Sequence, residues 1–431
     1  MRCRGSWRWP AATLCLAGTL LTGTAPAAAG AAPAPAADTP PGHVAQVASI
    51  SADGQVVTYA LDTDYWPGMP YYVNYIWDRS DGSTVRLTPN GGRADPRSAL
   101  SADGRYLAYG VWLDGSGWQV QVCRRAGLLC STVSVDPRGR PGNGASGGPT
   151  LSADGRYLAF YSVASDLVAG DTNDAADLFV LDRQTNRIRR VSIDSAGQQA
   201  NGDSSVGTIS ASGRYVVFSS VATNLVAGDT NRAEDVFVRD LRFGTTHRIS
   251  LGPGGQQADS TSGQDISAIS ANGRYIAFTS YAGNLVPGDT GIGTQVFVRD
   301  LRFGTTHRIS VSSAGQQADN ESVATAISAD GRFIAFTSAA TNLVPGDTNH
   351  ATDVFIRDLR FGTTRRVSLG HASRQGNYDS TSAVLSADGR YVAFSSAASN
   401  LVPRDSDGVA DAFVRDLWTH TTRWIGYDPI E

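Results

Sequence analysis

Apolar residues occur in short runs, separated by Gly, Asn, Asp and Thr, along the whole chain after about residue 43. In the stretch 204–250 this pattern predicts four strands, at 204–210, 214–220, 235–240 and 247–250. The second and third contain the runs YVVF and VFV, in which apolar and polar positions do not alternate. Such runs indicate strands that are covered on both faces, so we expect small antiparallel sheets packed against one another.

The unit repeats along the chain. A tetrad Ser-Ala-(Asp/Ser/Asn)-Gly recurs at intervals of 50 to 60 residues, beginning at Ser51, Ser101, Ser152, Ser210, Ser270, Ser328 and Ser386. Seven four-stranded units in one ring predict an all-β chain, a seven-bladed β-propeller of antiparallel blades. The expected blades are about 43–92, 93–142, 143–200, 201–260, 261–318, 319–376 and 377–431.

The tetrad and the strand after it resemble a known family. They read SADGRYLAF at 152–160, SADGRFIAF at 328–336 and SADGRYVAF at 386–394. This is similar to the PD40 (WD40-like) repeats of TolB-like β-propellers, whose signature is a Ser-Pro-Asp-Gly turn before an Ile-Ala-Phe-like strand. Ala replaces the family's Pro in every copy. The resemblance implies the fold; it does not carry over the partners of TolB, whose additional N-terminal domain has no counterpart here.

The N-terminus predicts export. The chain begins with three basic residues, Arg2, Arg4 and Arg8, followed by an apolar stretch at 11–21 and by Ala-x-Ala sites. This order is typical of a secretory signal peptide. We assign 1–30 to the signal peptide and 31–42 to an Ala/Pro-rich linker. The apolar stretch is shorter than a membrane span requires, so we expect a secreted protein with no membrane span after cleavage.

Composition and net charge limit the classes of molecule that this chain can bind. The chain has no Lys and a formal net charge of −4, so neither a nucleic-acid footprint nor a basic membrane-binding patch is present. We expect a monomer. In an exported protein, Cys123 and Cys130, which flank a short turn between two strands, predict a hairpin disulfide.

Blade topology assigns each loop to a face. The SADGR and LRFGTTHR turns fall on one rim, for which we expect the arginines Arg214, Arg242 and Arg248 and their copies. The AGDTN loops and the blade connections fall on the opposite, Asp-rich face. We therefore expect the molecule to be electrically polarised. For the arginines themselves we prefer the interpretation that they are solvated turn residues.

A loop motif on the Asp-rich face has the spacing Asp-x-(Asn/Asp)-x-x-x-Asp. Its copies are Asp171/Asn173/Asp177, Asp229/Asn231/Asp235, Asp347/Asn349/Asp353 and Asp405/Asp407/Asp411. Alternating oxygens in a tight turn are ligands that calcium prefers, whereas Asp and Asn also cap turns through their own backbone. Blade five has Asp289, Gly291 and Gln295 instead, and this joint loss favours a shared ligand, so both interpretations stand.

Aromatic residues gather in the first two blades. Trp66 and Tyr71 lie in the long loop 62–72, and Trp112 and Trp118 lie nearby in blade two. We name these four residues as a candidate recognition surface for an extracellular glycan or protein. The alternative is that they pack the seam where the ring closes.

Two classes of function remain. No HExxH, Cys/His metal set or nucleophile elbow is present, and the His residues do not cluster. The first hypothesis is therefore a secreted binding scaffold, stabilised by calcium. The alternative is a carbohydrate-active or other hydrolytic propeller with carboxylates on the axis; if only Ser, Thr, Ala and Gly line that axis, the alternative loses its site.

Overall fold

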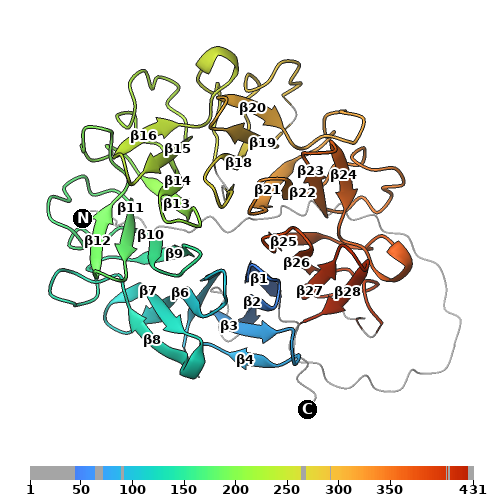
Figure 1. The fold of residues 1–431 in the computed structure, drawn as a ribbon, viewed down its shortest axis with the longest axis horizontal. Helices are drawn as coiled ribbons and strands as arrows, with labels where there is room; N and C mark the ends of the chain where they lie inside the picture. The colour runs from blue at the N-terminus through green and yellow to red at the C-terminus, as the bar shows by residue number, and fades with distance from the viewer. Residues whose placement is uncertain are drawn as a thin grey trace, which may run out of the picture. The chain divides into compact units, whose positions relative to one another are not determined.

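A computed structural model describes residues 44–63, 71–88, 92–263, 268–291, 293–403, 405 and 408–425. The predicted signal peptide and linker lie outside these ranges. Every four-stranded unit expected from the tetrads is present, and the strands of each unit pair in antiparallel order from first to fourth. Figure 1 shows the blades standing around a common centre, with the first strand of each innermost. The Tyr72–Ala94 pair joins blades one and two in one eight-stranded sheet, and the other five blades are separate four-stranded sheets.

The strands divide evenly among the blades. Blades one and two contain β1 (Ala45–Ile50), β2 (Val56–Thr63), β3 (Tyr71–Asp78), β4 (Thr84–Arg86), β5 (Ala94–Leu100), β6 (Tyr106–Leu113), β7 (Gly117–Arg124) and β8 (Leu129–Thr132). Blades three and four contain β9 (Ser146–Leu151), β10 (Tyr157–Ser162), β11 (Asp177–Asp182), β12 (Arg187–Arg190), β13 (Ser204–Ile209), β14 (Tyr215–Ser220), β15 (Asp235–Asp240) and β16 (Thr245–Arg248). Blades five to seven contain β17 (Ala268–Ile269), β18 (Tyr275–Ser280), β19 (Gln295–Asp300), β20 (Thr305–Arg308), β21 (Ser322–Ile327), β22 (Phe333–Ser338), β23 (Asp353–Asp358), β24 (Thr363–Arg366), β25 (Ser380–Leu385), β26 (Tyr391–Ser396), β27 (Asp411–Asp416) and β28 (Thr421–Trp424). Three short 3₁₀ turns, η1 (Ala126–Leu128), η2 (Pro253–Gly255) and η3 (His371–Ser373), lie in connections.

The unbroken apolar runs of the middle strands are explained by burial on both faces. In blade four, Val216 and Phe218 face the apolar side chains of blade three, whereas Val217 and Val236 face those of blade five. Phe218 also stacks on Phe237 of the next strand with ring centroids 5.7 Å apart. Each fully buried Val or Phe stabilises the folded state by roughly 1.5–3 kcal/mol. A separate hydrophobic core therefore holds each pair of neighbouring blades together.

The tetrad forms the turn between the first and second strands. In blade three, the Ser152 hydroxyl accepts the Tyr157 N–H (2.9 Å) and donates to the Asp154 carboxylate (2.6 Å). Gly155 has φ +66°, and a Cβ there would lie 2.7 Å from the Tyr106 ring of blade two. Only glycine combines this left-handed backbone with that close approach, whereas Ser212 and Asn272 take the place of the aspartate in blades four and five.

The Ala of the tetrad links successive blades. Its N–H donates to the carbonyl of the matching Ala in the next blade, in the pairs Ala52–Ala102, Ala102–Ala153, Ala153–Ala211, Ala271–Ala329, Ala329–Ala387 and Ala387–Ala52, at 2.8–3.0 Å. We call these bonds the axial alanine ring. Proline has no N–H to donate, which gives a physical reason for Ala where the family signature has Pro.

The ring closes without exchanging a strand among the described residues: blade one is built from β1–β4 and blade seven from β25–β28. Tyr59 and Trp77 of blade one pack with Tyr391 and Val414 of blade seven in one buried cluster. The Ala45 N–H also donates to the Ala410 carbonyl at 2.6 Å. Trp77 is therefore a seam residue.

Cys123 and Cys130 form the predicted disulfide, opposite one another in the β7–β8 register. It closes the outer hairpin of blade two. No helix in the described ranges is long and apolar enough to cross a bilayer.

The axial alanine ring supplies a test with an internal control. Ala153→Pro removes the N–H that donates to Ala211 and should cost about 1 kcal/mol of unfolding free energy relative to Ala211→Pro. Among the backbone hydrogen bonds of the described residues, Ala211 donates none, so its proline variant loses no bond in the same turn. Denaturant unfolding measures both variants; equal stability would show that the ring bonds contribute nothing.

Candidate functional site

The carboxylates of the predicted calcium motif are paired with an arginine from the same blade. In blade four, the Arg248 guanidinium lies 3.2 Å from Asp229 and 3.5 Å from Asp235. Gln257 of the blade connection also donates to Asp229 at 3.0 Å. The arginine and both aspartates are buried or nearly so, and the arginine supplies the positive charge that the motif was predicted to take from a cation.

The same ion pairs recur around the ring. Arg190 contacts Asp171 and Asp177, Arg366 contacts Asp347 and Asp353, and Arg308 contacts Asp289, with N–O distances of 2.8–3.3 Å. The expectation that Arg248 and its copies lie on the SADGR rim is therefore wrong. The fourth strand runs away from that rim, so its last residue reaches the opposite, Asp-rich face.

The asparagines of the motif bond within the protein as well. The Asn173 side-chain N–H donates to the Ala200 carbonyl at 2.9 Å, and the Asn173 side-chain oxygen accepts the Ala175 N–H at 3.2 Å. Asn231 and Asn349 repeat both contacts in blades four and six. The structure thus differs from the expectation that Asn173, Asn231 and Asn349 offer their oxygens to calcium. These oxygens cap the turn, which is the alternative interpretation of the motif.

The joint loss in blade five has an explanation within the protein. Asn231 donates its amide N–H to the Asp235 carboxylate at 3.2 Å, and Asn349 does the same to Asp353 at 3.1 Å. The two positions are direct partners, so replacing the Asp with Gln295 removes the acceptor that selects the Asn. A shared ligand is not needed to explain why both change together.

The fit to calcium therefore differs between blades. In blades three, four and six the carboxylates are already paired with the arginine guanidinium. The described residues also contain no group of three or more acidic, His or Cys side chains placed to hold a metal. Blade seven is the exception in sequence, because Trp424 stands where the other blades have this arginine. Asp405 is buried and Asp411 begins β27, whereas Asp407 lies outside the described residues.

Of the predicted aromatic surface, the structure brings two residues together. Trp112 and Trp118 face one another across β6 and β7, with ring centroids 5.8 Å apart and an edge-on geometry. The Arg93 guanidinium lies 5.8 Å from the Trp112 ring, which is 37% exposed. Trp66 and the side chain of Tyr71 lie outside the described residues, so their part in this surface stays a prediction.

The inner strands are not lined by small residues alone. Blade two places Asp95 and Arg97 on the innermost strand β5, and Gln46 lies on β1 of blade one. Burial raises the pKa of Asp95, and burial together with the charge of Asp95 raises the pKa of Tyr161. Within the inner strands that the structure describes, Asp95 is the one carboxylate left to the alternative hypothesis of an axial site.

The sequence analysis missed a set of exposed aromatic residues on the SADGR rim. We call Phe243, Phe303, Phe361 and Trp418 the rim aromatics; they are 65–68% exposed and lie in the turn between the third and fourth strands of blades four to seven. The signal was available, because a Phe recurs inside a predicted turn, LRFGTT, where packing gives it no role. Large apolar side chains exposed repeatedly on one rim indicate a contact surface.

Each rim aromatic is flanked by arginine. In blade four the Arg214 guanidinium lies 5.0 Å from the Phe243 ring centroid and forms a bidentate pair with Asp240. Arg242 lies 5.4 Å from the same ring and makes no ion pair in the described structure. Blades five and six repeat this arrangement with Arg302 and Arg360.

Comparison with solved structures identifies the architecture. The β-propeller domain of the trilobed protease from Pyrococcus furiosus matches with a TM-score of 0.55 and 11% identity, over 90% of this chain and 99% of that chain. The chain has the β-propeller fold. An oligogalacturonate lyase from Vibrio parahaemolyticus matches with a TM-score of 0.54 and 13% identity, over 88% of this chain and 92% of that chain.

TolB from Acinetobacter baumannii matches with a TM-score of 0.43 and 14% identity over 75% of this chain, and the chain spans 62% of that TolB chain. No protein-family model matches the sequence, and comparison with curated proteins finds no match. At these identities the similarity shows the β-propeller fold alone, so function has to be argued from the propeller's own residues.

The buried loop aspartates predict a pH effect. Burial raises the pKa of Asp353 to about 6, whereas an unfolded Asp titrates near its ordinary value of about 4. Between these values the folded state binds more protons, so the stability contributed by this group falls as pH rises from about 4 through about 6. In Asp353→Asn that loss should disappear, on the order of 2 kcal/mol between pH 4 and pH 7.

Urea unfolding of both proteins at pH 4, 5, 6 and 7 measures this difference. Gln295 shows that a neutral amide is accommodated at the same position of blade five, so the variant should fold. An unfolding free-energy difference between the two proteins that does not change with pH would contradict the raised pKa.

Proposed function

We propose that this chain is an exported, non-enzymatic binding scaffold that holds an anionic extracellular glycan along its SADGR rim. The observation that carries the proposal is the repetition of the rim aromatics, each beside arginine, on four successive blades. A flat aromatic ring offers a stacking surface to a sugar ring, and guanidinium groups bind carboxylates in bidentate fashion.

Repetition favours a polymer over a folded protein as the ligand. Phe243, Phe303 and Phe361 present the same pair of groups at equivalent positions of successive blades, and a ligand with its own repeat matches such an array. Several weak contacts on one chain then add up through their effective concentration. A protein ligand remains the competing outcome in the binding experiment.

The triple variant Phe243→Ala, Phe303→Ala and Phe361→Ala tests the array. We expect affinity for a uronate-containing polysaccharide to fall by at least about tenfold, because the stacking surfaces are lost. The melting temperature should change little, since these rings are 65–67% exposed. Titration calorimetry against acidic and neutral polysaccharides, at two salt concentrations, measures both charge preference and affinity.

Trp112→Ala is the matched control, because it removes an exposed aromatic from the opposite face of the ring. Binding that survives the triple variant and disappears in Trp112→Ala would move the site to the aromatic surface of blade two. Shortening of the polysaccharide during the titration, abolished in Asp95→Asn, would favour the hydrolytic alternative. Binding to a protein, with no polysaccharide bound, would overturn the glycan proposal.

We propose calcium binding for one loop only, that of blade seven. The proposal rests on the sequence Asp-Ser-Asp-Gly-Val-Ala-Asp at 405–411, which is close to the oxygen-rich Asp-x-Asp-Gly-x-x-Asp pattern of calcium loops. Calcium at about 10⁻⁴–10⁻³ M, the range of extracellular modules, should raise the melting temperature through mass action, and chelator should lower it.

Asp405→Ala should abolish that response, and Asp289→Ala should keep it, because Asp289 is paired with Arg308. Differential scanning fluorimetry measures both. A melting curve unmoved by calcium and chelator would remove metal binding from the scaffold and leave all the Asp loops as ion-paired turns.

A further inference from the structure

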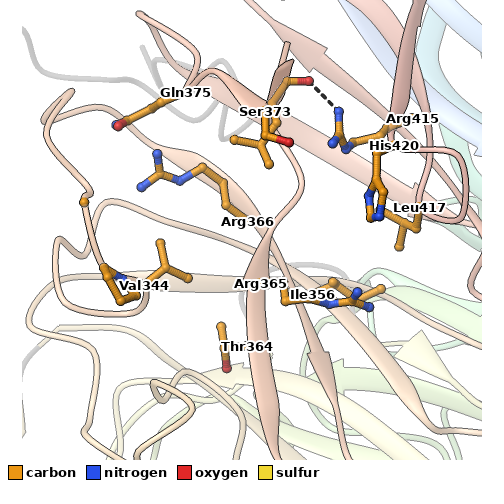
Figure 2. A pocket seen from close by; sticks show the side chains of 13 residues that line it. Val344, Ile356, Thr364, Arg365, Arg366, Ser373, Gln375, Arg415, Leu417 and His420 are labelled. Carbon is orange, nitrogen blue, oxygen red and sulfur yellow. Dashed lines mark hydrogen bonds between the residues drawn. The ribbon is translucent and has the colours of Figure 1, made fainter. Parts of the chain in front are cut away.

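A cavity of about 530 Å³ lies between blades six and seven. Blade six contributes the loop 344–346, Ile356 and the end of β24, and the blade connection contributes Leu369, Ser373 and Gln375. Blade seven contributes Arg415, Leu417 and His420. In Figure 2, His420 and Leu417 lie across the cavity from Val344 and Gln375. Its volume is within the range of small-molecule sites.

The repeats show that this cavity carries two unusual side chains. Ser373 has φ 59°, and the equivalent residues of the preceding connections are Gly197, Gly255 and Gly315, all with positive φ. A residue with a Cβ is disfavoured in this left-handed backbone. The chain therefore tolerates strain to place a hydroxyl at this position of the cavity.

His420 also replaces a glycine of the other repeats, in the turn between β27 and β28. Its φ is 56°, and the equivalent residues of blades four to six are Gly244, Gly304 and Gly362. Strained positions of this kind cluster at ligand sites. Both replacements of glycine line one cavity, whereas Asn186, which replaces glycine at the same turn position of blade three, does not line it.

The lining is cationic. Arg365, Arg366, Arg415 and His420 line the cavity, and none of its lining residues is acidic. Arg366 is neutralised by Asp347, at 2.8 Å. Arg365 is exposed and makes no ion pair in the described structure, and it replaces the His found at 247 and 307.

Arg415 adds a buried positive charge with neutral partners. Its side chain is 2% exposed, and it donates to the Leu369 carbonyl at 2.7 Å and to the Thr422 hydroxyl at 2.8 Å. Burial lowers its pKa. Arg239, Arg299 and Arg357 make the same kind of contacts in blades four to six, so Arg415 belongs to the repeat and here adds its charge to the lining of the cavity.

Apolar side chains form the remainder of the wall. Val344, Pro345, Ile356, Leu369 and Leu417 line the cavity beside the cationic groups. We propose that this cavity binds a small organic anion, whose carboxylate or phosphate group meets Arg365, His420 and Ser373 and whose apolar body lies against these residues. The proposal goes beyond the glycan scaffold and does not depend on the rim aromatics.

The probes separate charge from apolar contact. Titration calorimetry with hexanoate and hexyl phosphate, against hexanol and inorganic phosphate as single-feature controls, should give binding to at least one of the first two. The better of the two identifies the head group. Equal binding of hexanol would overturn anion recognition, equal binding of inorganic phosphate would overturn the apolar contact, and no binding by either anion would overturn the proposal.

Three single variants test the lining, and two of them restore the glycine of the other repeats. Arg365→Ala should weaken binding about tenfold. Ser373→Gly and His420→Gly should each weaken it several-fold while the melting temperature stays equal or rises, because the left-handed strain is relieved. A loss of binding therefore cannot be attributed to unfolding.

Asn186→Gly is the matched control. Asn186 holds the same turn position in blade three with φ 54° and does not line the cavity, so this variant relieves equivalent strain and should bind the probe unchanged. Binding that is unaffected by all three cavity variants, or equally reduced by Asn186→Gly, would place the anion elsewhere. The triple rim variant should also bind the probe normally, which keeps this result separate from the fate of the glycan proposal.

Discussion

The architecture depends on one turn, in which a buried serine, a polar residue (Asp, Ser or Asn) and a left-handed glycine hold the inner hairpin of each blade. The serine hydroxyl closes the turn internally, and the glycine allows the preceding blade's aromatic ring to approach. The alanine N–H beside them joins the turn to the next blade. Because the same four residues satisfy the turn, the packing and the inter-blade bond, the tetrad cannot drift without opening the ring, and it recurs with little change while the loops around it vary.

The fold could be predicted because its determinants are local. The tetrad and the apolar runs are each determined by contacts within or next to one hairpin, and the seven copies give the same prediction seven times. The contacts of the Asp loops could not be predicted in the same way. Arg248 and Asp229 meet only when the direction of the fourth strand is known, and Asn231 and Asp235 vary together because they bond directly. The same spacing of Asp and Asn residues is found whether the carboxylates bind a metal ion or pair with an arginine, so the spacing alone does not distinguish the two.

Charge pairing within the blades also alters the predicted polarity. Arg214, Arg274, Arg332 and Arg390 pair with aspartates on the SADGR rim, and the last arginine of the fourth strand pairs with aspartates on the opposite face. Both faces therefore neutralise much of their own charge at short range, and little net field is expected from these pairs. Arg242, Arg302 and Arg360 form no ion pair in the described structure, and each stands beside an exposed ring.

Function in a repeat protein of this kind is then carried by what the repeat does not require. A residue that satisfies the turn or the core is explained by stability, and its recurrence says nothing about a ligand. The rim phenylalanines recur without a packing role, and the residues of blades six and seven depart from glycine where glycine would be more stable. Both features cost the folded state something, and each places a side chain where another molecule can reach it. Glycine at 373 and 420 would avoid the left-handed strain, so both proposals rest on positions that the turn and the core do not explain.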